Sequence, residues 1–252
     1  MVANRLDQAL VERGLCESRE KARRAIMAGD VTINRQPAGK PSDRVRPGDH
    51  LAVAAGEKYV SRGGLKLEHA LRFFKMDVTG QTAIDLGAST GGFTDCLLQH
   101  GASRVYAVDV GQGQLAWKLR QDPRVVVMEK TNARDLVPAA FSKPYFPADL
   151  VVIDCSFISL TRILPAAVGL LRRAGKMVAL IKPQFEAGKA EADKGKGVIT
   201  DPAIHARVLH ELEEFAAQQP LMTWRGTTES PLLGPAGNKE FFALIEKTGM
   251  ES

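Results

Sequence analysis

From residue 81 onward, the chain alternates short apolar runs with segments of helical periodicity, and this alternation limits the folds that it can adopt. Nearly continuous apolar strands joined by helical crossovers are typical of a parallel sheet that is covered on both faces. The sequence therefore predicts an α/β domain. The runs that we predict to be its parallel strands are residues 83–86, 104–109, 124–128, 150–154 and 177–181.

The last part of the chain predicts one more helix and one more strand. Asp201 and Pro202 suit the cap and the first position of a helix that runs through about Gln218. Residues 241–245 form a final apolar run. A last strand antiparallel to its neighbours would bring its amino-terminal end, with Glu240, back to the edge at which the parallel strands end.

The positive charge of the chain is concentrated near its amino terminus. Residues 1–62 hold 12 Lys and Arg against 8 Asp and Glu, whereas residues 63–252 hold 22 against 21. A basic segment joined to a nearly neutral one is typical of a polyanion-binding module attached to a second domain. An ordinary solvated surface is the alternative.

The basic segment predicts two short helices packed on a small sheet. Leu6, Ala9, Leu10 and Leu15 recur at helical spacing and are expected to face inward. A second helix, capped by Ser18 and ended by Gly29, would bury Ala22, Ala25 and Ile26 and expose basic residues. Residues 31–34 and 51–53 alternate like strands, and residues 54–58 are small and polar, like a linker.

This pattern resembles the S4 (alpha-L) RNA-binding domain. The matching positions include Arg5-Leu6-Asp7, Leu10, Gly14, Ser18-Arg19, Ala22, Ile26, Gly29, Val31, Asn34, Lys40-Pro41 and Gly48-Asp49. The resemblance implies an α+β domain over residues 1–54, followed by a linker at 55–62, and a grip on structured RNA through phosphates and shape. The candidate phosphate contacts are Arg5, Arg19, Arg23 and Arg24; a solvated helix face is the alternative.

A glycine-containing loop follows the first predicted strand of the larger domain. Gly87 and Gly91 permit a tight turn and a close approach of a ligand to the backbone, but their spacing is not that of the dinucleotide fingerprint. Asp109 ends the next strand, where a carboxylate can accept hydrogen bonds from ribose hydroxyls. The loop resembles the S-adenosylmethionine loop of class I methyltransferases, which implies a Rossmann-like sheet. The implied cofactor contacts are Asp85, Gly87, Ser89, Gly91, Phe93, Asp109, Asn132, Ala133 and Asp154.

Charged residues also end two later strands. Asp154 follows the run at 150–153 and Lys182 follows the run at 177–181, so both are expected at the crevice where ligands bind open parallel sheets. Neither charge is favourable there without a partner. Lys66 lies in the first turn of a predicted helix, where a cation opposes the helix dipole. This conflict between residue and position suggests a functional role.

Lys66, Asp154, Lys182 and Glu240 together resemble the Lys-Asp-Lys-Glu tetrad of FtsJ-like RNA ribose 2′-O-methyltransferases. An S4 domain joined to such a catalytic domain, here residues 63–252, resembles the TlyA family of ribosomal RNA methyltransferases, historically labelled haemolysins. The resemblance implies that the four residues are catalytic, with Lys182 as the general base or the group that orients the hydroxyl. Such methyl transfer needs no metal. Arg62 and Lys189 are further candidate RNA contacts; Lys189 lies in a polar, Gly-rich segment after Lys182, for which a disordered surface loop is the alternative.

The same resemblance implies a cytidine 2′-hydroxyl in ribosomal RNA as the acceptor. Dual-acting relatives have extensions at both ends, whereas here four residues precede Arg5 and twelve follow Glu240, which favours the large subunit. The alternatives are a non-enzymatic RNA-binding or assembly factor, a haemolysin, and a methyltransferase acting on a base or on transfer RNA.

The sequence predicts a cytoplasmic protein without a membrane span. Its three cysteines are widely spaced, its amino terminus lacks an apolar signal core, and it contains no run of 18 apolar residues. His205 and His210 lie five residues apart, which is wrong for a metal pair on a helix, so both are expected on the surface or in packing contacts. Trp117 and Trp224 are interpreted as packing residues.

Overall fold

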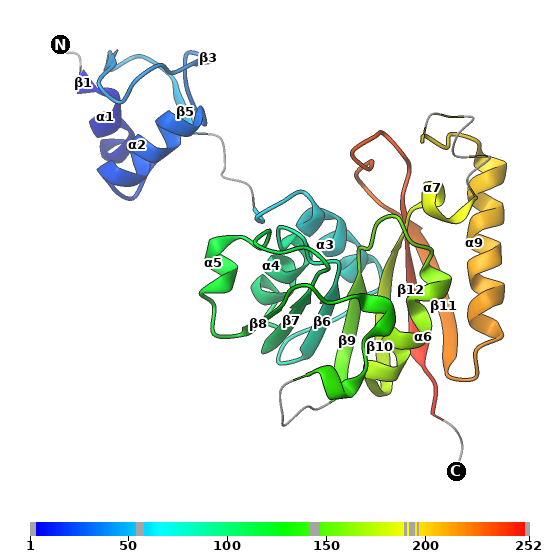
Figure 1. Ribbon diagram of the computed structural model, residues 1–252. Coiled ribbons are helices and arrows are strands. Elements are labelled where there is room, and N and C mark those ends of the chain that lie inside the picture. The colour runs from blue at the N-terminus through cyan, green and yellow to red at the C-terminus, as the bar shows by residue number, and fades with distance from the viewer. Residues whose placement is uncertain are drawn as a thin grey trace. The chain divides into compact units, whose positions relative to one another are not determined.

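The computed structural model describes residues 4–53, 58–141, 147–188, 191, 195 and 197–249 (Figure 1). The chain divides into two compact units, residues 1–58 and residues 59–252. Each unit has its own hydrophobic core. Tyr59, which we assigned to the linker, belongs instead to the larger unit, because its ring is buried against Leu67 and its neighbours there. Residues 54–57 of the predicted linker lie outside the described residues.

The smaller unit has two helices and short strands, as predicted. The hydroxyl of Ser18 accepts a hydrogen bond from the backbone N–H of Lys21, and Gly29 ends the second helix in the left-handed conformation with φ +82°. Leu15 is an exception to the predicted packing: the first helix ends at Glu12, and Leu15 is exposed. The elements are β1 (Asn4–Arg5), α1 (Leu6–Glu12), α2 (Arg19–Ala28), β2 (Val31–Ile33), β3 (Gln36–Pro37), β4 (Arg44–Val45) and β5 (Leu51–Val53).

These strands form two small antiparallel sheets, one pairing β1 with β4 and the other in the order β3-β2-β5. The two helices pack on them through apolar residues spaced along one face of each helix. The buried residues of this core are Leu6, Ala9, Leu10, Ala22, Ile26, Val31, Val45 and Leu51.

The larger unit is built on a seven-stranded sheet. Its strands are β6 (Thr82–Leu86), β7 (Arg104–Val108), β8 (Val125–Met128), β9 (Ala148–Ile153), β10 (Leu171–Ile181), β11 (Met222–Glu229) and β12 (Phe241–Lys247). The order across the sheet is β11-β12-β10-β9-β6-β7-β8. All neighbouring pairs from β10 to β8 are parallel, and β12 is antiparallel to both of its neighbours. This arrangement confirms the predicted α/β fold class and the antiparallel last strand.

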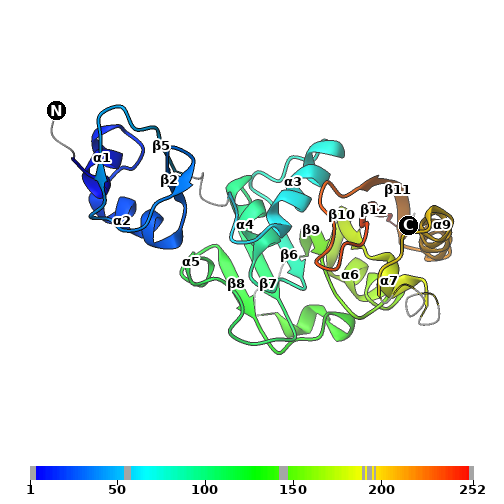
Figure 2. The same ribbon diagram turned by 90° about the horizontal axis from the view of Figure 1, so that it is seen from above.

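Helices cover both faces of this sheet (Figures 1 and 2). Its helices are α3 (Gly63–Phe73), α4 (Gly92–Gln99), α5 (Trp117–Arg120), α6 (Leu164–Leu170), α7 (Pro183–Glu186), α9 (Pro202–Ala217) and the 3-10 turns η1 (Ala133–Asp135), η2 (Pro138–Ala140) and η3 (Leu160–Arg162). Alternate strand residues enter two separate cores: Ala83 packs with α3 and α4, whereas Ile84 packs with α6 and α9. Burial on both faces explains why the strands are apolar throughout.

Two details differ from the sequence prediction. We predicted no strand over Met222–Glu229, which is β11 at the edge of the sheet. Trp117 is exposed rather than packed, whereas Trp224 is partly buried against the core as expected. Among the described residues, none of the helices has the length and apolar character needed to cross a bilayer.

Candidate functional site

Two adjoining cavities open beyond the carboxyl ends of the parallel strands of the larger unit. The first has a volume of about 650 Å³ and the second about 370 Å³. Both are lined by residues that directly follow β6 and β9, which is where open parallel sheets bind ligands. The residues shared by the two cavities are Gly87, Ser89, Asp154, Ser156 and Phe157.

One buried ion pair joins α3 to the start of β12. The Nζ atom of Lys66 lies 2.5 Å from Oε2 of Glu240, and their side chains are only 10% and 1% exposed. Lys66 is in the first turn of its helix, so the carboxylate neutralises a cation that the helix dipole disfavours. The resemblance to the tetrad grouped Lys66 with Glu240; the structure adds that the two side chains form an ion pair.

A second ion pair joins the ends of β9 and β10. The Nζ atom of Lys182 lies 2.6 Å from Oδ1 of Asp154. It also donates a hydrogen bond of 2.8 Å to the hydroxyl of Ser156. Ser156 lines both cavities; it belongs to a motif that matches the resembled family, but the sequence predicted no role for its hydroxyl.

The strand register explains why both pairs face the same cavity. Ile181 at the end of β10 pairs with Phe241 at the start of β12. Lys182 and Glu240 are therefore the next residues on adjacent antiparallel strands. Lys66, Asp154, Lys182 and Glu240 all line the first cavity.

The loop after β6 forms one wall of this site. Gly87 has φ +87°, and a Cβ atom added there would lie 2.6 Å from the backbone oxygen of Asp154. Gly87 is thus required both for the turn and for close packing against the end of β9. Ser89 lines both cavities, and Phe93 lines the first.

Two residues that we expected to contact a cofactor line neither cavity. A Cβ atom on Gly91 would lie 2.3 Å from Cδ1 of Leu119, so this glycine, with φ +99°, serves the packing of the loop on α5. Asp85 is fully buried and accepts a hydrogen bond of 2.7 Å from the hydroxyl of Thr94. Burial raises the pKa of Asp85 to about 7. Both residues therefore support the loop after β6 without lining either cavity.

The second cavity gathers the remaining predicted cofactor contacts. It is lined by Asp109, Asn132 and Ala133. The carboxylate of Asp109 accepts backbone hydrogen bonds from Ser89 at 2.8 Å and from Gly111 at 2.7 Å. This aspartate therefore also holds the loop after β6, a role that sequence analysis did not assign to it.

Phe157 stands at the junction of the two cavities. Its side chain is exposed, its φ is +63°, and its ring lies 5.0 Å from that of Phe185, which also lines the first cavity. A large apolar residue with positive φ is unusual. Phe157 belongs to the motif Asp154-Cys155-Ser156-Phe157-Ile158-Ser159, which matches the resembled family, but its backbone conformation could not be predicted from that motif.

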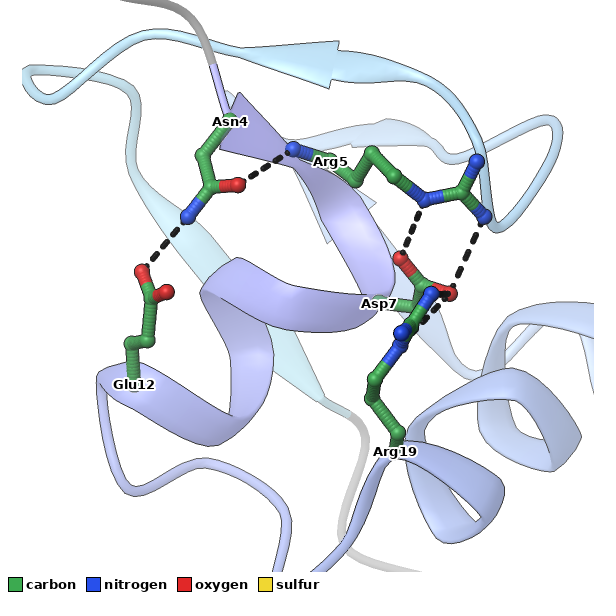
Figure 3. Close-up of polar contacts among 5 residues, drawn as sticks. All are labelled: Asn4, Arg5, Asp7, Glu12 and Arg19. Carbon is green, nitrogen blue, oxygen red and sulfur yellow. Dashed lines mark hydrogen bonds and ion pairs between the residues drawn. The ribbon is translucent and has the colours of Figure 1, made fainter.

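The predicted RNA contacts belong to both units of the chain. Arg62 lines the first cavity. Lys189 lies outside the described residues. In the smaller unit, Arg5 and Arg19 both bond to Asp7 (Figure 3), whereas Arg23 and Arg24 lie on the exposed face of α2. Arg24 is paired with Glu20 one turn earlier.

His205 and His210 lie in packing and surface contacts, respectively, as predicted. His205 is buried and its Nε2 atom lies 3.0 Å from the backbone oxygen of Ile199, while His210 pairs with Glu214 on the surface of α9. Across the described part of the chain, no three His, Cys, Asp or Glu side chains are grouped as metal ligands.

Comparison with known proteins identifies both units. A family model for FtsJ-like methyltransferases matches residues 59–247, and one for the S4 domain matches residues 4–51. The YqxC protein of Bacillus subtilis is 52% identical over 246 residues, which cover 97% of this chain and 86% of that protein. A Mycobacterium tuberculosis protein named 16S/23S rRNA (cytidine-2′-O)-methyltransferase TlyA is 48% identical over 245 residues, or 96% of this chain and 89% of that one.

A solved structure from Lactococcus lactis is 49% identical, with a TM-score of 0.72 over 77% of this chain and 90% of that chain. The matches agree with the two units of the fold and with the resemblance that the sequence motifs indicated. The chain belongs to the FtsJ-like methyltransferases, in the group that joins this domain to an amino-terminal S4 domain and includes TlyA.

Proposed function

We propose that this protein transfers a methyl group from S-adenosylmethionine to the ribose 2′-hydroxyl of a cytidine in large-subunit ribosomal RNA. The observation behind the proposal is the pair of lysine–carboxylate contacts, Lys66–Glu240 and Lys182–Asp154, on one cavity beside a glycine loop. The name of the M. tuberculosis relative, which gives both 16S and 23S rRNA, supports a cytidine 2′-hydroxyl of ribosomal RNA as the acceptor.

The residues of the second cavity suit S-adenosylmethionine. Asp109 supplies carboxylate oxygens for ribose hydroxyls, Asn132 and Ala133 offer polar and small surfaces, and Gly87 leaves backbone uncovered. When bound, this cofactor supplies an electrophilic methyl group on a sulfonium. Positioning of the acceptor then provides much of the rate acceleration.

Lys182 is the residue best placed to act on the acceptor hydroxyl. Nζ of Lys182 is an ammonium where it pairs with Asp154, and only after it loses one proton does it have the lone pair that a base needs. Asp154 forms an ion pair with Nζ at 2.6 Å and Ser156 accepts a hydrogen bond from it at 2.8 Å, so these two residues hold the amine in place. Held in this way, Nζ can orient the 2′-hydroxyl or, as the neutral amine, accept its proton. Lys66 and Glu240 line the same cavity.

Replacing Asp109 by alanine is expected to weaken the binding of S-adenosylmethionine by about tenfold or more, since it removes charge-assisted hydrogen bonds and loosens the loop at Ser89. Isothermal titration calorimetry measures this loss. Asp135→Asn is the matched control, because Asp135 is exposed, lines neither cavity and pairs only with its neighbour Arg134 among the described contacts. Unchanged affinity in Asp109→Ala would contradict the assignment.

The direct test offers methyl-labelled S-adenosylmethionine and purified protein to unmodified large and small ribosomal subunits separately. We expect label in ribose of the large subunit, mapped to one cytidine by nuclease digestion. Label in both subunits would retain the reaction and broaden the substrate. Cofactor and subunit binding without label would instead favour a non-enzymatic assembly factor.

A further inference from the structure

The smaller unit contains a carboxylate that is buried between two arginines (Figure 3). Asp7, in the first turn of α1, has a side chain that is 0% exposed. Arg5 donates to it from Nε at 3.0 Å and from Nη2 at 3.1 Å. Arg19 donates to it from Nε at 3.3 Å and from Nη2 at 3.1 Å. One carboxylate thus accepts hydrogen bonds from two guanidinium groups that belong to different elements.

Each guanidinium uses a single edge in this contact. A guanidinium has five N–H donors in a rigid plane, and the edge formed by Nε and Nη2 faces Asp7 in both arginines. The other N–H bonds are left for other partners. The two arginine side chains are 37% and 54% exposed, so their remaining edges are accessible to solvent.

Asp7 allows two like charges to stay close together. The Nη2 atoms of Arg5 and Arg19 both bond to the same oxygen, Oδ2. The hydrogen bond from Arg5 is the main reason that the pKa of Asp7 is lowered, so the carboxylate is ionised at neutral pH. The backbone N–H of Asp7 is itself bonded to the carbonyl of Pro41 at 3.1 Å. The cluster therefore has a fixed base and a net charge of one positive unit.

We propose that Asp7 is a positioning residue for RNA binding, which holds Arg5 and Arg19 as a preformed pair whose free edges grip backbone phosphates of structured RNA. The inference rests on the proposed function in one respect, that the smaller unit binds RNA. Planar guanidinium groups match phosphate oxygens in geometry, and a fixed pair loses less side-chain entropy on binding than two free arginines. Because phosphates carry no sequence information, this contact orients the RNA rather than selecting it.

A positioning role for Asp7 predicts a change in RNA affinity opposite to the change that charge alone would produce. Asp7 places a negative charge beside an RNA-binding surface. If charge alone mattered, Asp7→Asn would tighten RNA binding and steepen its dependence on salt. If Asp7 positions the arginines, the same substitution weakens binding, because the amide can no longer accept hydrogen bonds at both of its polar atoms.

The test measures binding of the full chain to protein-free large-subunit ribosomal RNA and to an RNA hairpin, across a series of salt concentrations. We expect Asp7→Asn to weaken binding to both by about tenfold, equivalent to one charge-assisted contact. Glu17→Gln is the matched control: it removes one negative charge from an exposed pair with Lys21 in the same unit and should bind at least as tightly as the natural protein. Asp7→Asn that binds equally well or better would overturn the proposal.

A second variant keeps the proposal testable if Asp7→Asn disturbs the fold. Amide hydrogen exchange in α1 and α2 reports whether the unit is intact. Arg19→Lys retains the charge and leaves the Arg5–Asp7 contact in place, but it lacks the planar fork. We expect Arg19→Lys to bind about fivefold more weakly with an unchanged salt slope. Binding equal to that of the natural protein would overturn the inference, whereas a natural protein that binds neither RNA would overturn the proposed function as well.

Discussion

Replacing Lys182 by alanine is expected to lower the rate of methyl transfer by about a thousandfold, because a positioned proton acceptor typically contributes between a hundredfold and ten-thousandfold. Nζ of Lys182 is held by Asp154 and Ser156, and the residue lines the first cavity. Removing the amine leaves the acceptor hydroxyl without a group to take its proton. Single-turnover assays with labelled S-adenosylmethionine and unmodified large subunits measure the loss.

Two controls separate this effect from damage to the fold or to binding. Lys176→Ala removes a partly buried lysine from the middle of the same strand, β10, that lines neither cavity, and it should leave the rate unchanged within about twofold. Lys182→Arg keeps the charge but offers no neutral amine near pH 7, so it should be as inactive as alanine. Cofactor and RNA affinities should stay near those of the natural protein. Transfer retained by Lys182→Ala would contradict the role assigned to this residue.

The parallel strands could be predicted because burial on both faces makes them apolar throughout. Strand β11 could not, because it lies at the edge of the sheet, where Trp224 is half buried and Arg225 and Glu229 are exposed. The first half of β10 escaped prediction for a similar reason, since Arg172 and Arg173 point to solvent. Local apolar patterns identify the centre of a sheet better than its margins.

The candidate site shows a different limit. The positions of Asp154 and Lys182 directly after predicted parallel strands indicated that they share a crevice, because the carboxyl ends of parallel strands meet at one edge of a sheet. Which lysine pairs with which carboxylate depends on the register of β12 against β10, and no local pattern encodes that. The same holds for Gly91. The sequence predicted that this glycine contacts a cofactor, whereas in the structure a side chain at this position would clash with Leu119, which is a tertiary contact.

The arginines of the smaller unit illustrate the limit once more. Their charge and spacing predicted an exposed basic face, yet Arg5 and Arg19 are bonded to a buried aspartate. Asp7 occupies a position on α1 whose neighbours Leu6 and Leu10 are buried. A charged residue on the apolar side of a helix indicates a partner, although the sequence does not say which one.

Replacing Glu240 by glutamine is expected to lower the free energy of unfolding of the larger unit by about 3 kcal/mol, because it leaves the ammonium of Lys66 buried without a counter-charge. Urea unfolding measures this loss. The chain has two tryptophans, Trp117 and Trp224, and both belong to the larger unit, so tryptophan fluorescence follows that unit alone. Glu229→Gln is the control: it breaks an exposed pair with Lys239 and should cost less than about 1 kcal/mol.

A double variant distinguishes an unpaired charge from a lost packing contact. Lys66→Met removes the cation but keeps most of the side-chain volume. When combined with Glu240→Gln, it should yield a protein that is more stable than Glu240→Gln alone, because no charge is then left buried and unpaired. Losses that simply add would mean that the two side chains act independently. Since the pair joins α3 to the start of β12, restored stability without restored methyl transfer would show that its two charges serve the site and that the fold can dispense with them.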